Sequence, residues 1–242
     1  DTLDLLNLNR GLAISAADLV ETLRPLQHRA YSISSSPLAF ADEIHLTVAA
    51  VRWRNHDREH RGVASTWLSD HLHEGESGQI FLSPNKSFRL PTDGDKPVIM
   101  VGPGTGIAPF RAFLQARQAG GAAGKNWLFF GDQHRECDFI YEDEIGDFCS
   151  NGTLTRLDLA FSRDQEEKIY VQQRMRENGA ALFAWLQEGA YFYVCGDATR
   201  MARDVDQALH DVVQRHGNLS EDDALEYVNQ LRRDKRYLRD VY

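Results

Sequence analysis

Residues 97–111 read P-V-I-M-V-G-P-G-T-G-I-A-P-F-R, and this stretch decides the fold. A short apolar run, Val98–Val101, leads into a glycine-rich turn that opens a helix. Gly102, Gly104 and Gly106 carry no Cβ, so a ligand can come close to the backbone. Free amides at the start of a helix also favour a negative charge. The stretch predicts a buried strand and a phosphate-binding loop, although its spacing is not the G-x-G-x-x-G of the common dinucleotide fingerprint. A purely structural turn is the alternative if the stretch is taken alone.

Strands and helices alternate after Pro97, which predicts a parallel sheet covered by helices on both faces. The expected strands are Val98–Val101, Trp127–Phe130, Leu154–Phe161 and Tyr191–Cys195. An apolar stripe at period 3.6 predicts a helix over residues 201–213, and another helix is expected near 220–236.

The first part of the chain shows other patterns. Apolar and polar residues alternate in 31–34, 44–51 and 79–82, which predicts antiparallel strands of a barrel or sandwich, with one short helix near 64–72. Residues 1–28 have helical spacing, with Ser15 as the expected N-cap of a second helical piece. Pro, Asp and Gly cluster near 91–97 and mark a boundary. We therefore expect a helical remnant of a connecting domain at 1–28, a partial all-β barrel at 29–94, and an α/β domain at 95–242.

Composition excludes several classes of function. The 242 residues carry a formal net charge of -9, which disfavours binding to nucleic acid or to an anionic membrane. The three cysteines, Cys137, Cys149 and Cys195, have no metal-ligand spacing. The sequence H-D-R-E-H at 56–60 fits a zinc peptidase pattern, but it lies in a charged turn and not on an apolar helix, so no metal site is expected. No apolar run is long enough to span a membrane, and no signal peptide is present, so we expect a cytoplasmic protein.

Further motifs follow in a fixed order along the chain. They are Arg29-Ala30-Tyr31-Ser32, Gly62-Val63-Ala64-Ser65, Ser162-Arg163 with Lys168-x-Tyr170, and Cys195-Gly196-Asp197, and Tyr242 ends the chain. The Arg29 guanidinium is a planar fork of donors that suits a pyrophosphate. Residues 62–65 precede a short helix and could contact a second phosphate. The cations at 163 and 168 suit a 2′-phosphate, whereas NAD sites place an acid near the ribose. A solvated pair in an acidic loop is the alternative for these cations.

Together these motifs resemble the FAD- and NADPH-binding part of the diflavin reductases, a branch of the ferredoxin–NADP reductase superfamily. Within that branch the chain is most similar to the flavoprotein subunits of NADPH-dependent sulfite reductases. The stretches that carry this closer resemblance are Leu23–Leu26, Lys125–Gly131 and Arg239–Tyr242. The resemblance covers essentially the whole chain, and it implies an FAD-binding barrel followed by an NADP-binding domain.

The resemblance also implies individual roles. The residues implied for FAD are Arg29, Ala30, Tyr31, Ser32, Thr47, Val48, Ala49, Trp53, Gly62, Val63, Ala64, Ser65 and Tyr242. The residues implied for NADP are Gly104, Thr105, Ser162, Arg163, Lys168, Ile169, Tyr170, Val171, Gln172 and Asp204. Ser32, Cys195, Asp240 and Tyr242 are implied to line the contact between the two cofactor rings. Trp53 stands where the family has a tyrosine. Cys195, taken alone, would be interpreted as a small buried core residue.

The function that the resemblance implies is hydride transfer from NADPH to FAD, with the two rings held about 3–3.5 Å apart. Electrons would continue through an FMN domain to a siroheme and iron–sulfur hemoprotein that reduces sulfite to sulfide. This chain holds no FMN-binding domain and lacks the first barrel strands, so we expect a piece of a longer polypeptide within a hetero-oligomer. Two alternatives stay open. One is a free-standing NADPH–flavodoxin, ferredoxin or cytochrome reductase. The other is a non-catalytic module whose incomplete barrel no longer retains FAD.

Overall fold

The computed structural model describes residues 2–9, 11–55 and 57–242. It divides into two compact units, residues 1–30 and 31–242, each of which is described by itself. The first unit contains two short helices, α1 (Thr2–Leu8) and α2 (Ala16–Thr22). The Ser15 hydroxyl accepts a hydrogen bond from the Asp18 amide at 3.1 Å, so the predicted N-cap of α2 is confirmed.

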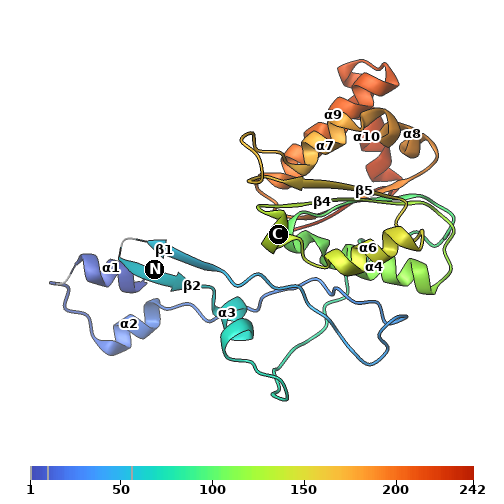
Figure 1. The fold of residues 1–242 in the computed structure, drawn as a ribbon. Helices are drawn as coiled ribbons and strands as arrows, with labels where there is room; N and C mark the ends of the chain where they lie inside the picture. Colours follow the sequence, from blue (N-terminus) through green and yellow to red (C-terminus); the bar gives the residue numbers. More distant parts are fainter. Residues whose placement is uncertain (1, 10, 56) are drawn as a thin grey trace. The chain divides into compact units, whose positions relative to one another are not determined.

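A five-stranded parallel sheet, in the order β5-β4-β3-β6-β7, is the base of the second unit (Figure 1). Its strands are β3 (Val98–Val101), β4 (Asn126–Asp132), β5 (Arg156–Phe161), β6 (Tyr191–Gly196) and β7 (Tyr237–Val241). The four predicted strands and their parallel pairing are confirmed. The fifth strand, β7, was not predicted, and it pairs with β6 at the edge of the sheet.

Helices cover both faces of this sheet, as the alternation of elements predicts. They are η1 (Gly104–Ile107, a 3-10 turn), α4 (Ala108–Ala119), α5 (Arg135–Asp138), α6 (Glu142–Ser150), α7 (Val171–Glu177), α8 (Gly179–Gln187), α9 (Met201–Gly217) and α10 (Glu221–Arg233). In Figure 1, α4 and α6 lie on one face, and α7 to α10 lie on the other. The two helices predicted near 201–213 and 220–236 are confirmed as α9 and α10.

The core has two layers because successive strand residues point to opposite faces of the sheet. Ile99 and Val101 pack in the layer under α7 to α10. Val98 and Met100 pack in the layer with α4 and α6. All four side chains are fully buried, and this explains why the predicted strand is apolar throughout.

Residues 31–94 contain much less regular structure. They hold an antiparallel hairpin of β1 (Arg52–Asn55) and β2 (Arg58–Arg61), the helix α3 (Val63–Asp70), and one isolated bridge between Ile33 and Leu46. The strands predicted at 31–34, 44–51 and 79–82 are not formed, so the predicted barrel is not confirmed.

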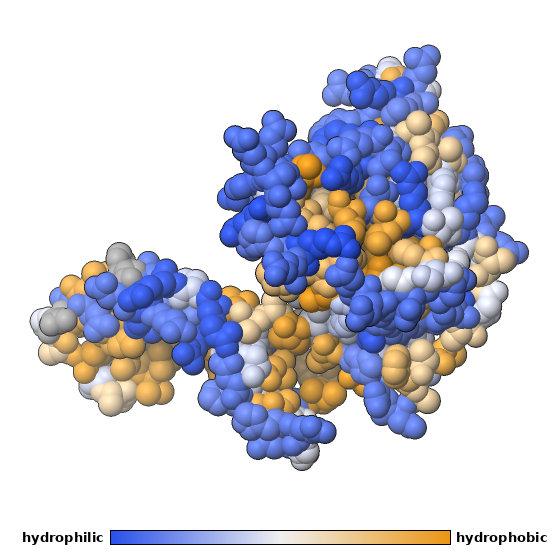
Figure 2. All heavy atoms as spheres, in the orientation of Figure 1, coloured by the Kyte–Doolittle hydropathy of each residue, from blue (hydrophilic) through white to orange (hydrophobic). Residues whose placement is uncertain are grey.

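The physical reason is that, apart from the single bridge between Ile33 and Leu46, these segments pair with no strand among the described residues. A strand needs hydrogen bonds from a neighbouring strand and a layer over its apolar face. The side chains of Ile80, Phe81 and Leu82 remain 72%, 67% and 64% exposed. Figure 2 shows hydrophobic residues at the surface in several places on the face that it presents.

No helix within the described ranges combines the length and the apolar character that a membrane crossing requires.

Candidate functional site

The glycine loop after β3 connects the sheet to α4. Gly104 has a φ of +56°, a left-handed conformation that favours glycine. A Cβ on Gly106 would lie 2.2 Å from the Cys195 carbonyl oxygen, so this glycine lets the loop touch the end of β6. Pro103, at the N-cap of η1, makes no side-chain cap hydrogen bond. The loop therefore has the close backbone approach of a phosphate-binding turn, and it lies beside the candidate ring-contact residue Cys195.

Three of the four residues implied for the ring contact meet at the ends of β6 and β7. Cys195 and Asp240 are direct partners in the β6–β7 register. The Ser32 hydroxyl donates to the Asp240 carboxylate at 3.1 Å. Burial, with a smaller contribution from Asp240, raises the pKa of the Cys195 thiol to about 12. The cluster therefore presents a protonated thiol beside a carboxylate at neutral pH.

The fourth residue, Tyr242, lies at the same edge of the sheet. Its hydroxyl shares a 2.9 Å hydrogen bond with the Thr105 hydroxyl in the glycine loop. Its backbone amide donates to the Gly196 carbonyl at 3.1 Å, and its own carbonyl accepts from the Ala198 amide at 3.0 Å. The Tyr242 side chain is 64% exposed. The last residue is therefore fixed by its backbone next to the glycine loop, while its ring stays accessible.

The candidate 2′-phosphate residues surround the loop between β5 and α7. Ser162 is buried, whereas Arg163 and Lys168 are exposed. Across the described parts of the chain, neither of these two cations forms an ion pair or a side-chain hydrogen bond. The neighbouring Asp164 is occupied by His134, at 3.0 Å, and by the Arg135 amide, at 2.9 Å. The two cations are thus available to an anionic ligand.

Other residues implied for NADP divide into exposed and core positions. Tyr170 is the N-cap of α7 and is 45% exposed. Gln172 donates to Asp204 on α9 at 3.5 Å, so these two polar residues lie together. Val171 is buried in the core, and Ile169 packs against it. The side chains of Val171 and Ile169 therefore stabilise the fold, which leaves only their backbone for a ligand.

The segment implied to hold the FAD diphosphate is the start of α3. Gly62 is its N-cap and makes no side-chain cap hydrogen bond, so the first amides of the helix lack a side-chain acceptor from that position. The Ser65 hydroxyl is already engaged, since it accepts from the Val51 amide at 3.1 Å and donates to the Gly62 carbonyl at 3.4 Å. Ser65 therefore joins α3 to the chain before β1, and the backbone amides of 63–65 are the better phosphate donors.

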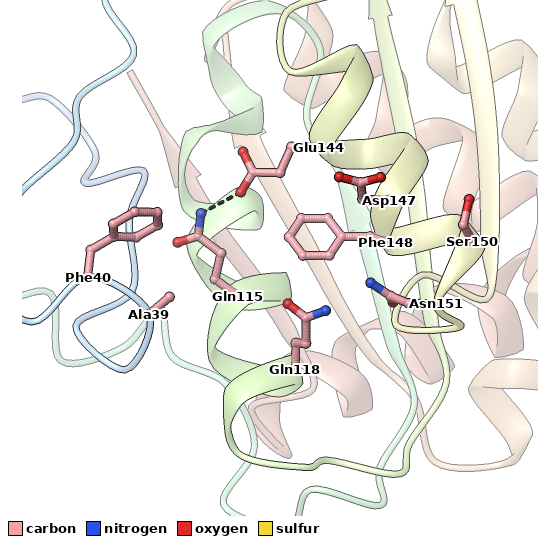
Figure 3. Close-up of a pocket in the computed structure, with 9 residues that line it drawn as sticks. All are labelled: Ala39, Phe40, Gln115, Gln118, Glu144, Asp147, Phe148, Ser150 and Asn151. Atoms are coloured by element: carbon pink, nitrogen blue, oxygen red, sulfur yellow. Dashed lines mark hydrogen bonds between the residues drawn. The ribbon is translucent and has the colours of Figure 1, made fainter.

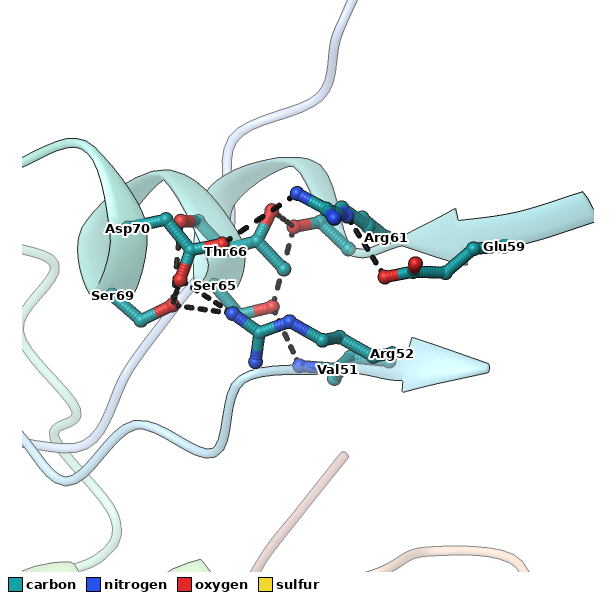
Figure 4. A network of polar contacts seen from close by, with 9 residues as sticks. Val51, Arg52, Glu59, Arg61, Ser65, Thr66, Ser69 and Asp70 are labelled. Atoms are coloured by element: carbon teal, nitrogen blue, oxygen red, sulfur yellow. Dashed lines mark hydrogen bonds and ion pairs between the residues drawn. The ribbon is translucent and has the colours of Figure 1, made fainter. Parts of the chain in front are cut away.

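A polar network braces this helix against the hairpin (Figure 4). Arg52 on β1 pairs with Asp70 at the end of α3, and the Ser69 hydroxyl donates to the same carboxylate at 2.6 Å. Arg61 on β2 lies 3.9 Å from the other oxygen of that carboxylate. The hydrogen bond from Ser69 and the Arg52 guanidinium hold the pKa of Asp70 below its usual value. The network fixes the end of α3 relative to β1 and β2.

Further residues implied for FAD occupy separate places. Trp53 stacks on His60 with ring centroids 5.1 Å apart, and half of its surface is exposed, which leaves an aromatic face for an adenine. The Thr47 hydroxyl shares a 2.7 Å hydrogen bond with the Tyr141 hydroxyl. Arg29 belongs to the first unit, where its guanidinium lies 3.4 Å from the carbonyls of the two preceding residues. The remaining implied positions are Ala30, in the first unit, Tyr31, which is half-buried, and Val48, Ala49, Val63 and Ala64, around the hairpin and α3.

Sequence reasoning missed Asn85 and Asp132 at this edge of the sheet, and it named Asp197 only as part of the motif Cys195-Gly196-Asp197, without a role. The Asn85 side chain donates to the other Asp240 oxygen at 3.4 Å. Asp132 ends β4 with a carboxylate oxygen 3.7 Å from where a Gly104 Cβ would lie, and burial raises its pKa. Asp197 accepts from the first amides of α9, which lowers its pKa to about 2. Their position after parallel strands was the available signal for Asp132 and Asp197, because ligands bind at the carboxyl ends of such strands.

The motif H-D-R-E-H was set aside as a metal site, and its first residue, His56, lies outside the described residues. Within the residues that the structure describes, no group of three or more His, Cys, Asp or Glu side chains could hold a metal ion.

Comparisons with known proteins find two families of cofactor-binding domain in this chain. The FAD binding domain family matches residues 2–67, and the oxidoreductase NAD-binding domain family matches residues 100–207. A sulfite reductase [NADPH] flavoprotein alpha-component from Mannheimia succiniciproducens is 56% identical over 95% of this chain and 38% of the relative. The protein of the same name from Bacillus subtilis is 48% identical over 100% of this chain and 40% of its own length.

The similarity covers nearly all of this chain but less than half of each relative. A third relative of that name, from Photorhabdus laumondii, is 52% identical over 94% of this chain and 38% of its own length. The chain thus spans about two fifths of the length of the curated relatives it matches. The chain therefore joins an FAD binding domain to an oxidoreductase NAD-binding domain, and it is 48–56% identical to sulfite reductase [NADPH] flavoprotein alpha-components over 94–100% of its own length.

Proposed function

We propose that this chain is the part of a flavoprotein reductase in which hydride passes from NADPH to FAD. One observation carries the proposal. Ser32, from the FAD-side segment, lies in a hydrogen-bonded cluster with Asp240 and Cys195, while Tyr242, two residues beyond Asp240, bonds to Thr105 in the glycine loop. Residues implied for the flavin and residues implied for the nicotinamide therefore meet at one edge of the sheet.

The residues present fit both cofactors. The start of α3 offers backbone amides to a diphosphate, and Trp53 offers a half-exposed ring to an adenine. Arg163 and Lys168, which have no ion-pair partner among the described residues, offer two cations to a 2′-phosphate, and this favours NADPH over NADH. FAD, when bound, accepts a hydride as two electrons and can release them one at a time.

The ring-contact residues position and tune this reaction. Hydride transfer needs two rings in contact and a site without competing water. The Cys195 thiol stays protonated, so it adds no charge of its own to the contact. Asp240, held by Ser32 and Asn85, supplies a fixed negative charge that favours positive charge developing nearby. Tyr242 covers this edge of the sheet, and we assign it the role of a gate that moves aside for the nicotinamide.

We assign the downstream steps from the names of the relatives. The matched relatives are sulfite reductase flavoprotein components, and more than half of their length lies outside the match. In such a protein the FAD side would form a barrel with further strands, and electrons would pass through an FMN domain to a siroheme and iron–sulfur hemoprotein subunit in the cytoplasm. We place the parts of this chain at 1–28 for a connecting domain, 29–94 for FAD and 95–242 for NADP.

An absorbance spectrum tests the proposal. The purified 242-residue chain is incubated with FAD, separated from free FAD, and measured without oxygen before and after NADPH is added. We expect a flavin band that NADPH bleaches. A colourless protein after incubation with FAD would support the non-catalytic alternative. Rapid reduction of free flavodoxin by the chain alone would favour the free-standing reductase.

A further inference from the structure

Arg111 on α4 makes an unusual set of contacts for a residue outside the ring-contact cluster. Its side chain is only 11% exposed and donates to Glu144 on α6 at 2.5 Å. The same guanidinium donates to the Ser34 carbonyl at 2.9 Å and lies 3.0 Å from the His45 ring nitrogen Nδ1. It also lies over the Tyr141 ring, 4.6 Å from the centroid. One largely covered cation thus joins two helices of the sheet domain to the FAD-side segment.

A second polar contact runs parallel to the first. Gln115, one helical turn after Arg111, accepts from the Ser36 amide at 2.9 Å and donates to Glu144 at 2.6 Å. Figure 3 shows the Gln115 and Glu144 side chains pointing toward one another beside a pocket of about 550 Å³ that Phe40 also lines. Glu144 is therefore shared between Arg111 and Gln115, and both hold the stretch that begins at Ser34.

The other arm of the FAD-side segment is held in the same place. The Thr47 hydroxyl bonds to Tyr141, whose ring lies against Arg111. The two arms are joined to each other, because the Ser34 amide donates to the His45 carbonyl at 2.8 Å and Ile33 is bridged to Leu46. Residues 32–47 therefore form one hairpin-like piece that is held by α4 and α6. We call the contacts that Arg111, Gln115 and Tyr141 make with this piece the grip.

Both ends of this grip are close to candidate cofactor residues. Ser32 precedes Ser34 by two residues and bonds to Asp240. Thr105 lies in η1, which runs directly into α4, the helix that carries Arg111. A shift of the grip would therefore change the position of Ser32 and Thr47 relative to Thr105.

We propose that Arg111, with Tyr141 and Glu144, is a positioning residue for hydride transfer. It fixes the FAD-side segment 32–47 against the helix that starts at the nicotinamide loop, and so sets the separation of the two rings. The proposal rests on the proposed function. Arginine suits this site because its hydrogen bonds leave from two separate nitrogens of a rigid plane, Nε toward Glu144 and Nη1 toward Ser34 and His45. The three donors of a lysine ammonium all leave from one nitrogen, so they cannot reproduce this spacing.

Arg111→Lys tests this, with Arg176→Lys as the matched control. Arg176 lies on the opposite face of the sheet, where it donates to Asp211 at 2.8 Å and to the Gln172 carbonyl at 3.5 Å. Among the described residues its hydrogen bonds and ion pair do not reach residues 32–47. The readouts are FAD content, the dissociation constant for NADPH, and the rate of flavin reduction at saturating NADPH. For Arg111→Lys we expect unchanged FAD content and NADPH affinity, and a rate at least about tenfold lower, because small misplacements of reacting groups are costly. An unchanged rate, or an equal loss in the control, would overturn the proposal.

Tyr141→Phe covers the case in which Arg111→Lys no longer holds FAD. It removes only the hydroxyl that bonds to Thr47 and keeps the ring beneath Arg111. We expect a smaller loss of rate in the same direction with FAD retained, and an unchanged rate would overturn the proposal.

Hydrogen–deuterium exchange separates this proposal from the proposed function, because it needs no turnover. Arg111→Lys should speed exchange of the amides in residues 33–47, and Arg176→Lys should not. If the wild-type chain holds FAD but NADPH never bleaches it, the proposed function fails while this exchange result still decides whether the grip exists. Equal exchange in all three proteins would refute the grip itself.

Discussion

Two regions of this molecule contain strand-like apolar segments, and only one of them forms a sheet. In β3, β4 and β6, residues such as Ile99, Phe129 and Phe192 are completely buried and every strand is paired. In residues 79–82 the apolar side chains face solvent. The sheet finds strand partners and two helical layers within residues 97–242. The FAD-side segment contacts the sheet domain through Ser34, Thr47 and Ser32, which bond to Arg111 on α4, to Tyr141 before α6 and to Asp240 on β7.

The largest effect should come from removing an aromatic ring in the sheet. Phe129→Ala empties a fully buried position, and we expect a loss of about 3–5 kcal/mol in the free energy of unfolding. Ile80→Ala removes a side chain that is 72% exposed, and we expect a change within about 0.5 kcal/mol. Urea unfolding followed by circular dichroism measures both. Losses of similar size would remove the distinction between the two regions.

A smaller effect should follow when a methyl group is added at the glycine loop. Gly106→Ala places a Cβ 2.2 Å from the Cys195 carbonyl, and we expect about 1–3 kcal/mol of destabilisation together with weaker NADPH binding. Gly146→Ala in α6 meets nothing within 4 Å and should stabilise by up to about 1 kcal/mol. Thermal unfolding of the two variants compares them. A Gly106→Ala protein as stable as wild type would show that the loop does not need this close approach.

Arg163 and Lys168, in the loop after β5, should strengthen the binding of NADPH but not that of NADH. Arg163→Ala combined with Lys168→Ala should weaken NADPH binding by about tenfold or more, since each charge-assisted contact contributes more than about 1 kcal/mol. NADH binding should stay nearly unchanged. Arg215→Ala, another exposed cation on the sheet domain, is the control and should affect neither. Fluorescence titration gives both dissociation constants, and equal losses for NADPH and NADH would refute the 2′-phosphate assignment.

The smallest effect should come from Asp197, whose carboxylate accepts from the Arg200 and Met201 amides at the start of α9. Asp197 has a pKa of about 2 in the folded chain against an ordinary value of 3.8, so its ionised form is favoured by folding. Its stabilising contribution is present at neutral pH and is lost as the pH falls from about 4 to about 2. Asp197→Asn keeps an acceptor but loses the charge, and should lower the melting temperature slightly at pH 7 and hardly at all at pH 2. The same difference at both pH values would mean that the charge plays no part.

The sheet could be predicted because the sequence patterns that indicate its strands and helices each lie within a few neighbouring residues. Apolar runs of four to seven residues, glycine turns and helical stripes are each visible in a short window. Strand β7 was missed because Y-L-R-D-V carries two charged residues and is tolerated only at the edge of the sheet, where β6 is its one partner. The predicted barrel depended on segments finding partners over long distances, and such pairing cannot be seen in the alternation of residues.

The candidate site was predicted in part, and largely through the resemblance. Ser32, Cys195 and Asp240 have no motif that joins positions so far apart, yet the structure brings them together. Asn85 and Arg111 were not foreseen. Arg111 in particular has no local signal in the sequence, because its partners Ser34, His45 and Glu144 are 77, 66 and 33 residues away. Burial and long-range hydrogen bonds, which only the fold supplies, identify such a residue.

The most direct measurement of the difference between the two regions is calorimetric titration of the 242-residue chain with 2′,5′-ADP, with and without added FAD. This ligand carries the 2′-phosphate but no nicotinamide, so it reports on the sheet domain alone. If the NADP side is complete within residues 97–242, the dissociation constant should be the same within about twofold in both titrations, because no new phosphate contact depends on FAD. Binding that appears only when FAD is present would contradict this account.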